Sequence, residues 1–128
     1  MPAKTPEQAH ELFVEYFNAA DIDALLSLYE PNATLVPFSG EPARGHAAIR
    51  EALGRFIGLK GHMELKVDKI FQADDVALIF SSWNLKRTGP DGESLELTGQ
   101  ASDVVRRQAD NTWRIVIDNP QGAAATKE

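Results

Sequence analysis

Residues 102–120 read SDVVRRQADNTWRIVIDNP, and this stretch predicts two β-strands joined by a tight turn. β-Branched residues and a tryptophan stand on both sides of a short polar segment, which is typical of a hairpin. We place the strands at residues 93–107 and 113–118, with Asp110-Asn111 as a two-residue turn between them. This part of the chain is therefore an antiparallel pair whose register follows from the turn.

That register brings two carboxylates together on one face of the sheet, because Asp103 faces Asp118. The same register pairs Val105 with Val116 and Arg107 with Arg114. Two like charges in this position destabilise a sheet unless one carboxyl keeps its proton through a raised pKa, and such a proton can be given to a substrate oxygen. Alternatively, a bulge or a longer loop shifts the register and separates the pair, and Asp118 only ends a strand.

Outward from the hairpin, the second half of the chain predicts two more strands. Residues 76–87 are rich in β-forming side chains, and residues 89–92 form a turn after them. Residues 63–72 alternate weakly between apolar and polar.

The first half predicts helices at about residues 6–20, 22–29 and 46–57, with a short strand at 33–38. Thr5 with Gln8 forms a capping box, Asp21 caps the second helix and Pro31 ends it. Helices first and antiparallel strands afterwards predict one α+β domain over residues 1–128, with three helices on one sheet. The polar tail, residues 121–128, is expected to fray.

Composition narrows the class of protein. The chain has 128 residues, 43% hydrophobic and 25% charged, as expected for one globular domain. It has no cysteine, which excludes disulfides, thiolate catalysis and cysteine-based zinc sites. A net charge of −6 argues against a nucleic-acid partner, and no apolar run is long enough for a membrane span. We therefore expect a cytoplasmic protein that binds neither nucleic acid nor a membrane.

Several strands are apolar on both faces, and three short helices cannot cover both. In residues 76–87 one face holds Val76, Leu78 and Phe80, and the other holds Ala77, Ile79 and Trp83. In the last two strands we place Val105 and Val116 on one face, and Val104, Trp113, Ile115 and Ile117 on the other. The outer face is therefore expected to be buried in a homodimer, the alternative being a few exposed aliphatic side chains.

Four stretches in this order resemble the nuclear transport factor 2-like superfamily. They are ALLSLYEPNAT at 24–34, GHAAIR at 45–50, SDVVRR at 102–107 and WRIVIDNP at 113–120. The chain looks most like the SnoaL-like and SgcJ/EcaC-like group of small bacterial proteins, and more distantly like ketosteroid isomerase. The resemblance implies a cone-shaped, cystatin-like fold, a dimer, and an apolar pocket between the helices and the concave face of a curved, mostly antiparallel sheet.

The likeness to ketosteroid isomerase implies roles for three positions. Its oxyanion tyrosine matches Tyr16 and its oxyanion aspartate matches Asp103, whereas its base, just before a Pro-Phe pair, matches Val36. Valine cannot move a proton, which argues against steroid isomerase activity. Asp118 could replace the base from another wall, whereas Tyr16 could simply be helix core.

Further residues are interpreted as lining the pocket: Tyr29, Val36, Phe38, Phe56 and Trp83. The histidines lack the spacing of a metal site and no glycine-rich phosphate loop is present, so no metal and no cofactor is expected. We expect either a cofactor-independent isomerase, cyclase or hydrolase acting on a small apolar carbonyl or hydroxyl compound, with Asp103, Asp118 and Tyr16 as catalytic residues, or a non-catalytic binding or assembly domain.

Overall fold

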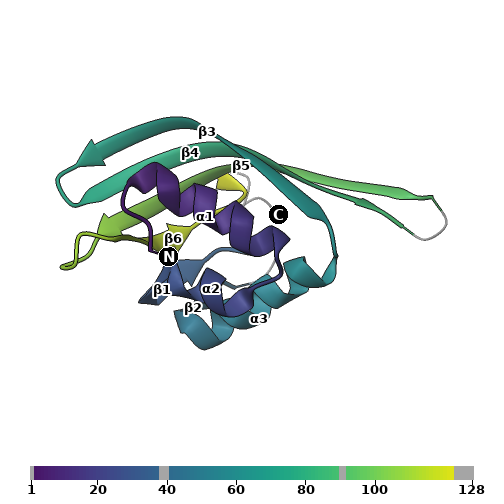
Figure 1. Ribbon diagram of the computed structural model, residues 1–128, viewed down its shortest axis with the longest axis horizontal. Coiled ribbons are helices and arrows are strands. Elements are labelled where there is room, and N and C mark those ends of the chain that lie inside the picture. Colours follow the sequence, from purple (N-terminus) through teal and green to yellow (C-terminus); the bar gives the residue numbers. More distant parts are fainter. Residues whose placement is uncertain (1, 38–40, 90–91, 123–128) are drawn as a thin grey trace.

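The computed structural model describes residues 2–37, 41–89 and 92–122. In chain order the elements are α1 (Pro6–Asn18), α2 (Ile22–Ser27), β1 (Tyr29–Leu35), β2 (Ala43–Arg44), α3 (Gly45–Gly58), β3 (His62–Ala73), β4 (Val76–Thr88), β5 (Ser94–Arg107) and β6 (Trp113–Asp118). The predicted α+β class is confirmed, and Figure 1 shows the three helices packed on one curved sheet.

Helix α1 begins where the sequence predicts, because side chains satisfy backbone groups that a helix start leaves unpaired. Thr5 accepts a hydrogen bond from the N–H of Gln8 (3.1 Å), and the Gln8 side chain accepts one from the N–H of Lys4 (2.6 Å). Asp21 caps α2 in the same way by accepting from the N–H of Ala24 (3.1 Å). These caps fix the ends of the helices that cover the sheet.

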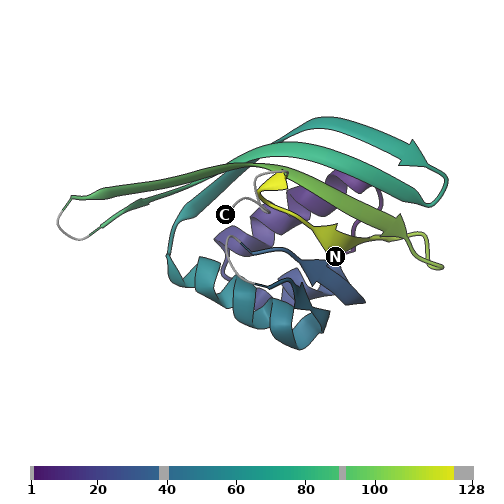
Figure 2. The ribbon, with the colours of Figure 1, turned by 180° about the vertical axis from the view of Figure 1, so that it is seen from behind.

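The six strands lie in the order β2-β1-β6-β5-β4-β3. All neighbours are antiparallel except β1 and β6, which are parallel. Figures 1 and 2 show the helices on the concave side of the curved sheet, while the far ends of β4 and β5 extend beyond them as a two-stranded ribbon. The core therefore lies between the helices and the concave face.

The region after α2 differs from the prediction. Tyr29 begins β1 instead of closing the second helix, and the strand continues through Pro31. The pairing of β1 with β6 is irregular between Tyr29 and Thr34, and such a bulge accommodates a proline. The short β2 was not predicted; it pairs with β1 through Thr34–Arg44 and Leu35–Ala43.

The two faces of the long strands have different environments. Every second residue of β4 from Ala77 to Leu85 is buried against the helices. On the opposite face Phe71, Val76 and Ile117 are 56%, 39% and 40% exposed. The convex face thus carries apolar side chains that the described residues leave in contact with solvent.

After β6 the chain makes one more ordered turn. The N–H of Gly122 donates to the carbonyl of Asn119 (3.1 Å), and Gly122 is buried. It has φ +56°, and a side chain there would lie 2.6 Å from the carbonyl oxygen of Gln100, so only glycine fits. Of the tail that we expect to fray, residues 123–128 lie outside the described residues.

Candidate functional site

Two departures from a regular hairpin bring Asp103 and Asp118 together. The connection is one residue longer than predicted: the N–H of Gln108 donates to the carbonyl of Thr112 (2.7 Å), and Asn111 between them has φ 67°. The longer loop shifts the register by one residue, and a bulge farther along β6 shifts it back. The two offsets cancel, and Asp103 and Asp118 interact as predicted.

Between the loop and the bulge the predicted pairs are wrong. Val105 pairs with Ile115 rather than Val116, and Arg107 pairs with Trp113 rather than Arg114. The like-charged pair is Arg106 with Arg114, and Arg106 is bound by both carboxylate oxygens of Glu30 (2.8 and 3.0 Å).

The predicted division of side chains between the two faces also changes. Val105, Trp113 and Ile115 are all buried, whereas the paired Val104 and Ile117 are half-buried and exposed. The longer loop places Val105 on the same face as Trp113 and Ile115, and the bulge moves Ile117 to the other face, because each extra residue reverses the alternation of side chains.

A chain of buried polar groups runs through the carboxylate pair. Nε2 of His10 lies 2.7 Å from Oδ2 of Asp103, and the N–H of Asn119 donates to Oδ1 of Asp103 (2.7 Å). The hydroxyl of Tyr29 donates to Oδ2 of Asp118. His10, Asp103 and Asp118 are each less than a tenth exposed, and Tyr29 is fully buried. Four polar side chains thus form one connected group inside the protein.

The surroundings divide the roles of the two carboxyls. Burial raises the pKa of Asp118 well above its usual value, and the negative charge of Asp103 and the hydrogen bond with its side chain act in the same direction. The hydrogen bond from the Tyr29 hydroxyl acts in the opposite direction. Burial and the charge of Asp118 also raise the pKa of Tyr29. Asp103 accepts a hydrogen bond from the N–H of Asn119 on one oxygen and contacts Nε2 of His10 with the other. The surroundings of Asp118 therefore favour its protonated form.

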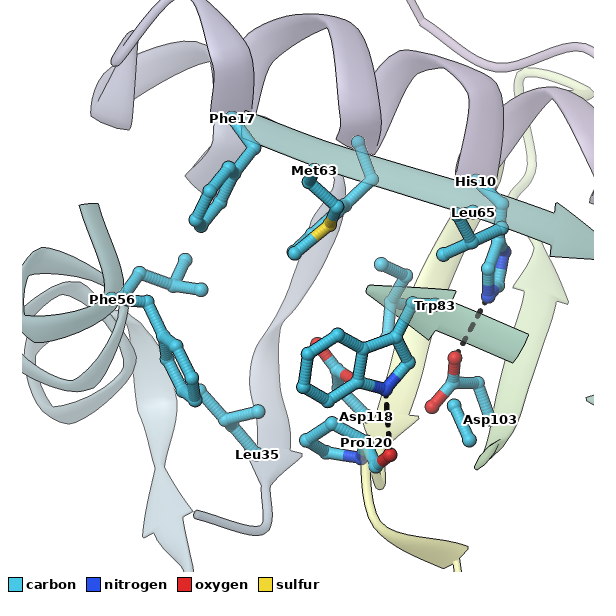
Figure 3. Close-up of a pocket in the computed structure, with 14 residues that line it drawn as sticks. His10, Phe17, Leu35, Phe56, Met63, Leu65, Trp83, Asp103, Asp118 and Pro120 are labelled. Atoms are coloured by element: carbon cyan, nitrogen blue, oxygen red, sulfur yellow. Dashed lines mark hydrogen bonds and ion pairs between the residues drawn. The ribbon is translucent and has the colours of Figure 1, made fainter. Parts of the chain in front are cut away.

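The two carboxyls lie at one end of an otherwise apolar cavity. Its volume is about 50 Å³, room for a few water molecules. The lining residues are His10, Phe13, Phe17, Leu35, Leu53, Phe56, Met63, Leu65, Trp83, Ala101, Asp103, Ile115, Asp118 and Pro120. Figure 3 shows Phe17 and Phe56 at one end, and His10 with Asp103 at the other. A bound molecule would meet apolar walls and a single polar end.

Trp83 joins the two ends of this cavity. Its indole N–H donates to the carbonyl of Pro120 (2.8 Å), which holds the segment after β6 against the sheet. Gly99 lies opposite Trp83 in the sheet, and a side chain there would lie 2.6 Å from the indole ring. The glycine therefore allows the indole to lie where it forms a wall of the cavity.

The structure separates the residues that the sequence proposed for the site. Asp103, Asp118, Phe56 and Trp83 line the cavity. Tyr29 does not line it and instead binds Asp118 from behind.

The remaining proposed residues lie elsewhere. Val36 donates its backbone N–H to the carbonyl of Asp118 (2.8 Å) and is not a lining residue, because it continues β1 alongside β6. Tyr16 packs against the core without lining the cavity. Phe38 falls outside the described residues.

His10 was missed as a site residue. Its partner Asp103 stands 93 positions away in the chain, so no spacing rule could connect the two. A weaker signal was present: His10 precedes Phe13 and Phe17 by three and seven residues, which places it on the apolar face of α1. A lone histidine in such a stripe indicates a buried polar contact.

Within the described parts of the chain, no three His, Asp or Glu side chains gather closely enough to hold a metal ion. No helix there is long and apolar enough to cross a membrane.

The fold and the pocket define a class of protein, the cone-shaped α+β domains with a cavity between helices and sheet. Residues 10–116 match the family model described as the SnoaL-like domain. The chain belongs to the SnoaL-like family, within the nuclear transport factor 2-like superfamily. Comparison with curated protein sequences finds no significant match.

Solved structures with the same fold have diverse descriptions. A candidate calcium/calmodulin-dependent protein kinase type II association domain from Thiobacillus denitrificans is 20% identical over 95% of this chain and 98% of that one, with a TM-score of 0.79. A ketosteroid isomerase-like protein from Erwinia carotovora atroseptica is 21% identical over 88% of each chain, with a TM-score of 0.75. A candidate dehydratase of the superfamily from Streptomyces avermitilis is 17% identical over 88% of this chain and 89% of that one, with a TM-score of 0.74. At these identities the likeness establishes the fold alone.

Proposed function

We propose that this protein is a cofactor-independent enzyme that carries out acid/base chemistry on a small, mostly apolar carbonyl, epoxide or hydroxyl compound. The observation that carries the proposal is the buried pair Asp103–Asp118 at the polar end of an apolar cavity. Burying two carboxyls is costly, and a carrier of apolar molecules would not need them.

In this proposal Asp118 is the acid. Its proton passes to the substrate oxygen, and the electron pair of the bond that breaks or shifts stays on that oxygen. Asp103 is the ionised partner, which takes a proton from a substrate carbon or from an attacking hydroxyl group. Isomerisation, cyclisation, dehydration and epoxide opening all follow this scheme. Tyr29 positions Asp118 from behind and does not touch the substrate.

The pocket restricts the substrate. A volume of about 50 Å³ suits a compound of only a few heavy atoms, and the apolar end with Phe17 and Phe56 suits a short alkyl group. Val36 at the position of the isomerase base argues in the same direction. A fused-ring steroid is therefore not the proposed substrate.

The test is turnover of a panel of small epoxides, cyclic ketones and β-hydroxyketones. Asp118→Asn and Asp103→Asn keep the side-chain shapes but remove the proton donor and acceptor, so each should lower kcat roughly 10²- to 10⁴-fold. Asp74→Asn is the matched control, because Asp74 is exposed and its φ of 52° suits asparagine. If both cavity variants turn over a compound as fast as the control, the acid/base proposal is wrong.

A second proposal concerns assembly, and the exposed apolar side chains of the convex face favour it. Phe71, Val76 and Ile117 are each more than a third exposed, and Phe71 packs edge-on against Phe80. We propose that a second copy of the chain covers this face in a homodimer. The resemblance to a candidate kinase association domain fits an assembly role, with or without catalysis.

Light scattering after gel filtration tests the dimer. The wild type should elute with twice the chain mass, and Phe71→Glu with Ile117→Lys should elute with the mass of one chain. Glu15→Lys changes an exposed residue of α1 and should leave the mass unchanged. A wild type with the mass of one chain at all concentrations would refute this proposal.

A further inference from the structure

His10 forms the partition between two hollows. From inside, it lines the cavity that holds Asp103 and Asp118. From outside, it lines a surface groove between α1 and β3, together with Glu7, Glu11, Val14, Leu65 and Val67. Its side chain is only 4% exposed, so the imidazole fills the space between solvent and site.

The two ring nitrogens of His10 have different surroundings. Nε2 lies 2.7 Å from Oδ2 of Asp103, whereas Nδ1 is buried and has no hydrogen-bond partner among the described residues. An imidazole holds its proton on either nitrogen, or protons on both. A buried nitrogen without a hydrogen-bond partner lowers the stability of the fold, and this cost points to a functional use for Nδ1.

We propose that His10 carries protons between the groove and the carboxyl pair Asp103–Asp118. This inference rests on the proposed function for its purpose: a substrate in the cavity would cover the open side of both carboxyls. The other described contacts offer no exit, because Tyr29 behind Asp118 is fully buried and Asn119 occupies Oδ1 of Asp103. His10 then provides the remaining connection to solvent.

The proposed relay moves one proton at each of the two ring nitrogens. A protonated water that enters from the groove gives a proton to the otherwise buried Nδ1, and the Nε2 proton moves to Oδ2 of Asp103. The ring is neutral before and after, with its proton moved from Nε2 to Nδ1. The reverse transfer returns one proton to the groove and restores the ring. Inward and outward steps therefore alternate, which suits a reaction without net proton uptake.

The charges around His10 favour proton transfer between the groove and the carboxyl pair. On α1 the exposed Glu7 and Glu11 flank the groove, and on the sheet Asp103 faces Nε2 with Asp118 behind it. The groove wall from β3 is formed by the uncharged Leu65 and Val67. All charged groups on these elements that face the ring are therefore acidic, and they attract protons to the groove.

The test measures proton exchange without any substrate, while xenon under pressure occupies the apolar cavity and covers the open side of both carboxyls. In carbon-detected NMR spectra near the titration midpoint, the rate at which the Asp118 carboxyl gains and loses its proton determines its line shape. His10→Gln keeps an N–H donor for Asp103 but cannot relay a proton, so exchange should slow about 10-fold or more. The matched control is His62→Gln, which removes an exposed imidazole and should leave the rate unchanged.

Two further variants make the outcome decisive. In His10→Ala, free imidazole added to the buffer should enter from the groove and restore the fast exchange. Glu11→Arg changes only the exposed groove and should slow exchange several-fold even if neither His10 variant folds. Exchange at the wild-type rate in His10→Gln, or in Glu11→Arg where that variant alone is measurable, would overturn the proposal. Because no substrate is used, this result is independent of whether turnover is found.

Discussion

The two faces of the sheet both depart from the usual rule that apolar side chains are buried and polar ones exposed. One face buries polar side chains, and the other exposes apolar ones. The concave face buries Asp103, Asp118 and His10 among apolar neighbours, and the convex face exposes Phe71 and Ile117. Buried polar groups and exposed apolar groups are the informative exceptions in a folded protein, because each costs stability unless it serves another purpose. The two proposals therefore divide between the faces, with acid/base chemistry proposed inside the cone and association of two chains proposed on the convex face.

The largest expected contrast is between two aromatic residues, one on each face. Trp83 is 6% exposed and Phe71 is 56% exposed. Trp83→Ala leaves a void and frees the carbonyl of Pro120, so we expect it to lower the free energy of unfolding by about 3–5 kcal/mol. Phe71→Ala should change the unfolding of a single chain by less than about 0.5 kcal/mol. Urea unfolding at low protein concentration measures both.

Equal losses in the two variants would contradict the division between the faces. A large loss only for Phe71→Ala would mean that the convex face contributes to folding, as in a dimer whose chains fold only together. Measuring the unfolding midpoint at several protein concentrations distinguishes this case, because the stability of a dimer depends on concentration.

The next contrast is the response of the buried carboxyls to pH. Because the pKa of Asp118 is raised on folding, the native state binds more protons than the unfolded chain above about pH 4. The contribution of Asp118 to stability is thus fully present below that pH and is lost as the pH rises through the folded-state pKa. The loss has a limiting slope of about 1.4 kcal/mol per pH unit.

Asp118→Asn removes this titration. The difference in the free energy of unfolding between variant and wild type should therefore shift in favour of the variant as the pH rises from 5 to 8. Parallel stability curves for the two proteins over this range would mean that Asp118 is ionised in the folded state. Tyr29 has the same sign of effect, but only above about pH 10, where a tyrosine in the unfolded chain ionises.

The sequence predicts local features of this fold well. Thr5 and Asp21 mark the helix starts, and the long strands follow from runs of β-formers between turn residues. The parallel pairing of β1 with β6 was not predictable, because it joins segments far apart in the chain. Local propensity carries no information on which distant strands become neighbours.

The candidate site was predictable only in part, for the same reason. Asp103 and Asp118 belong to one hairpin, so their proximity follows from local geometry, although the loop and the bulge each shift the register by one. His10 and Tyr29 reach these carboxyls from 93 and 89 positions away, and no local rule links such positions. Both were visible as polar groups within apolar surroundings, which identifies a residue without identifying its partner.

The smallest contrast concerns a single oxygen behind the carboxyl pair. The Tyr29 hydroxyl donates to Asp118 and lowers the pKa of that carboxyl, in opposition to burial and to Asp103. Tyr29→Phe keeps the ring in a fully buried site and removes only the donor, so it should lower the free energy of unfolding by about 1–2 kcal/mol. It should also raise the pKa of Asp118 further, which the carboxyl carbon resonance measures directly.

The direction in which the pKa of Asp118 changes in Tyr29→Phe shows whether Tyr29 positions Asp118 or only fills space. If Tyr29 only fills space, the phenylalanine variant leaves the Asp118 titration where it was. If its hydroxyl sets the acidity of Asp118, the titration moves to higher pH, and any activity that requires the protonated carboxyl persists to higher pH with it. Phe71→Leu on the convex face changes an aromatic residue that is not among the groups acting on Asp118, which are Asp103 and Tyr29. It should therefore leave both the Asp118 titration and the pH range of activity unchanged.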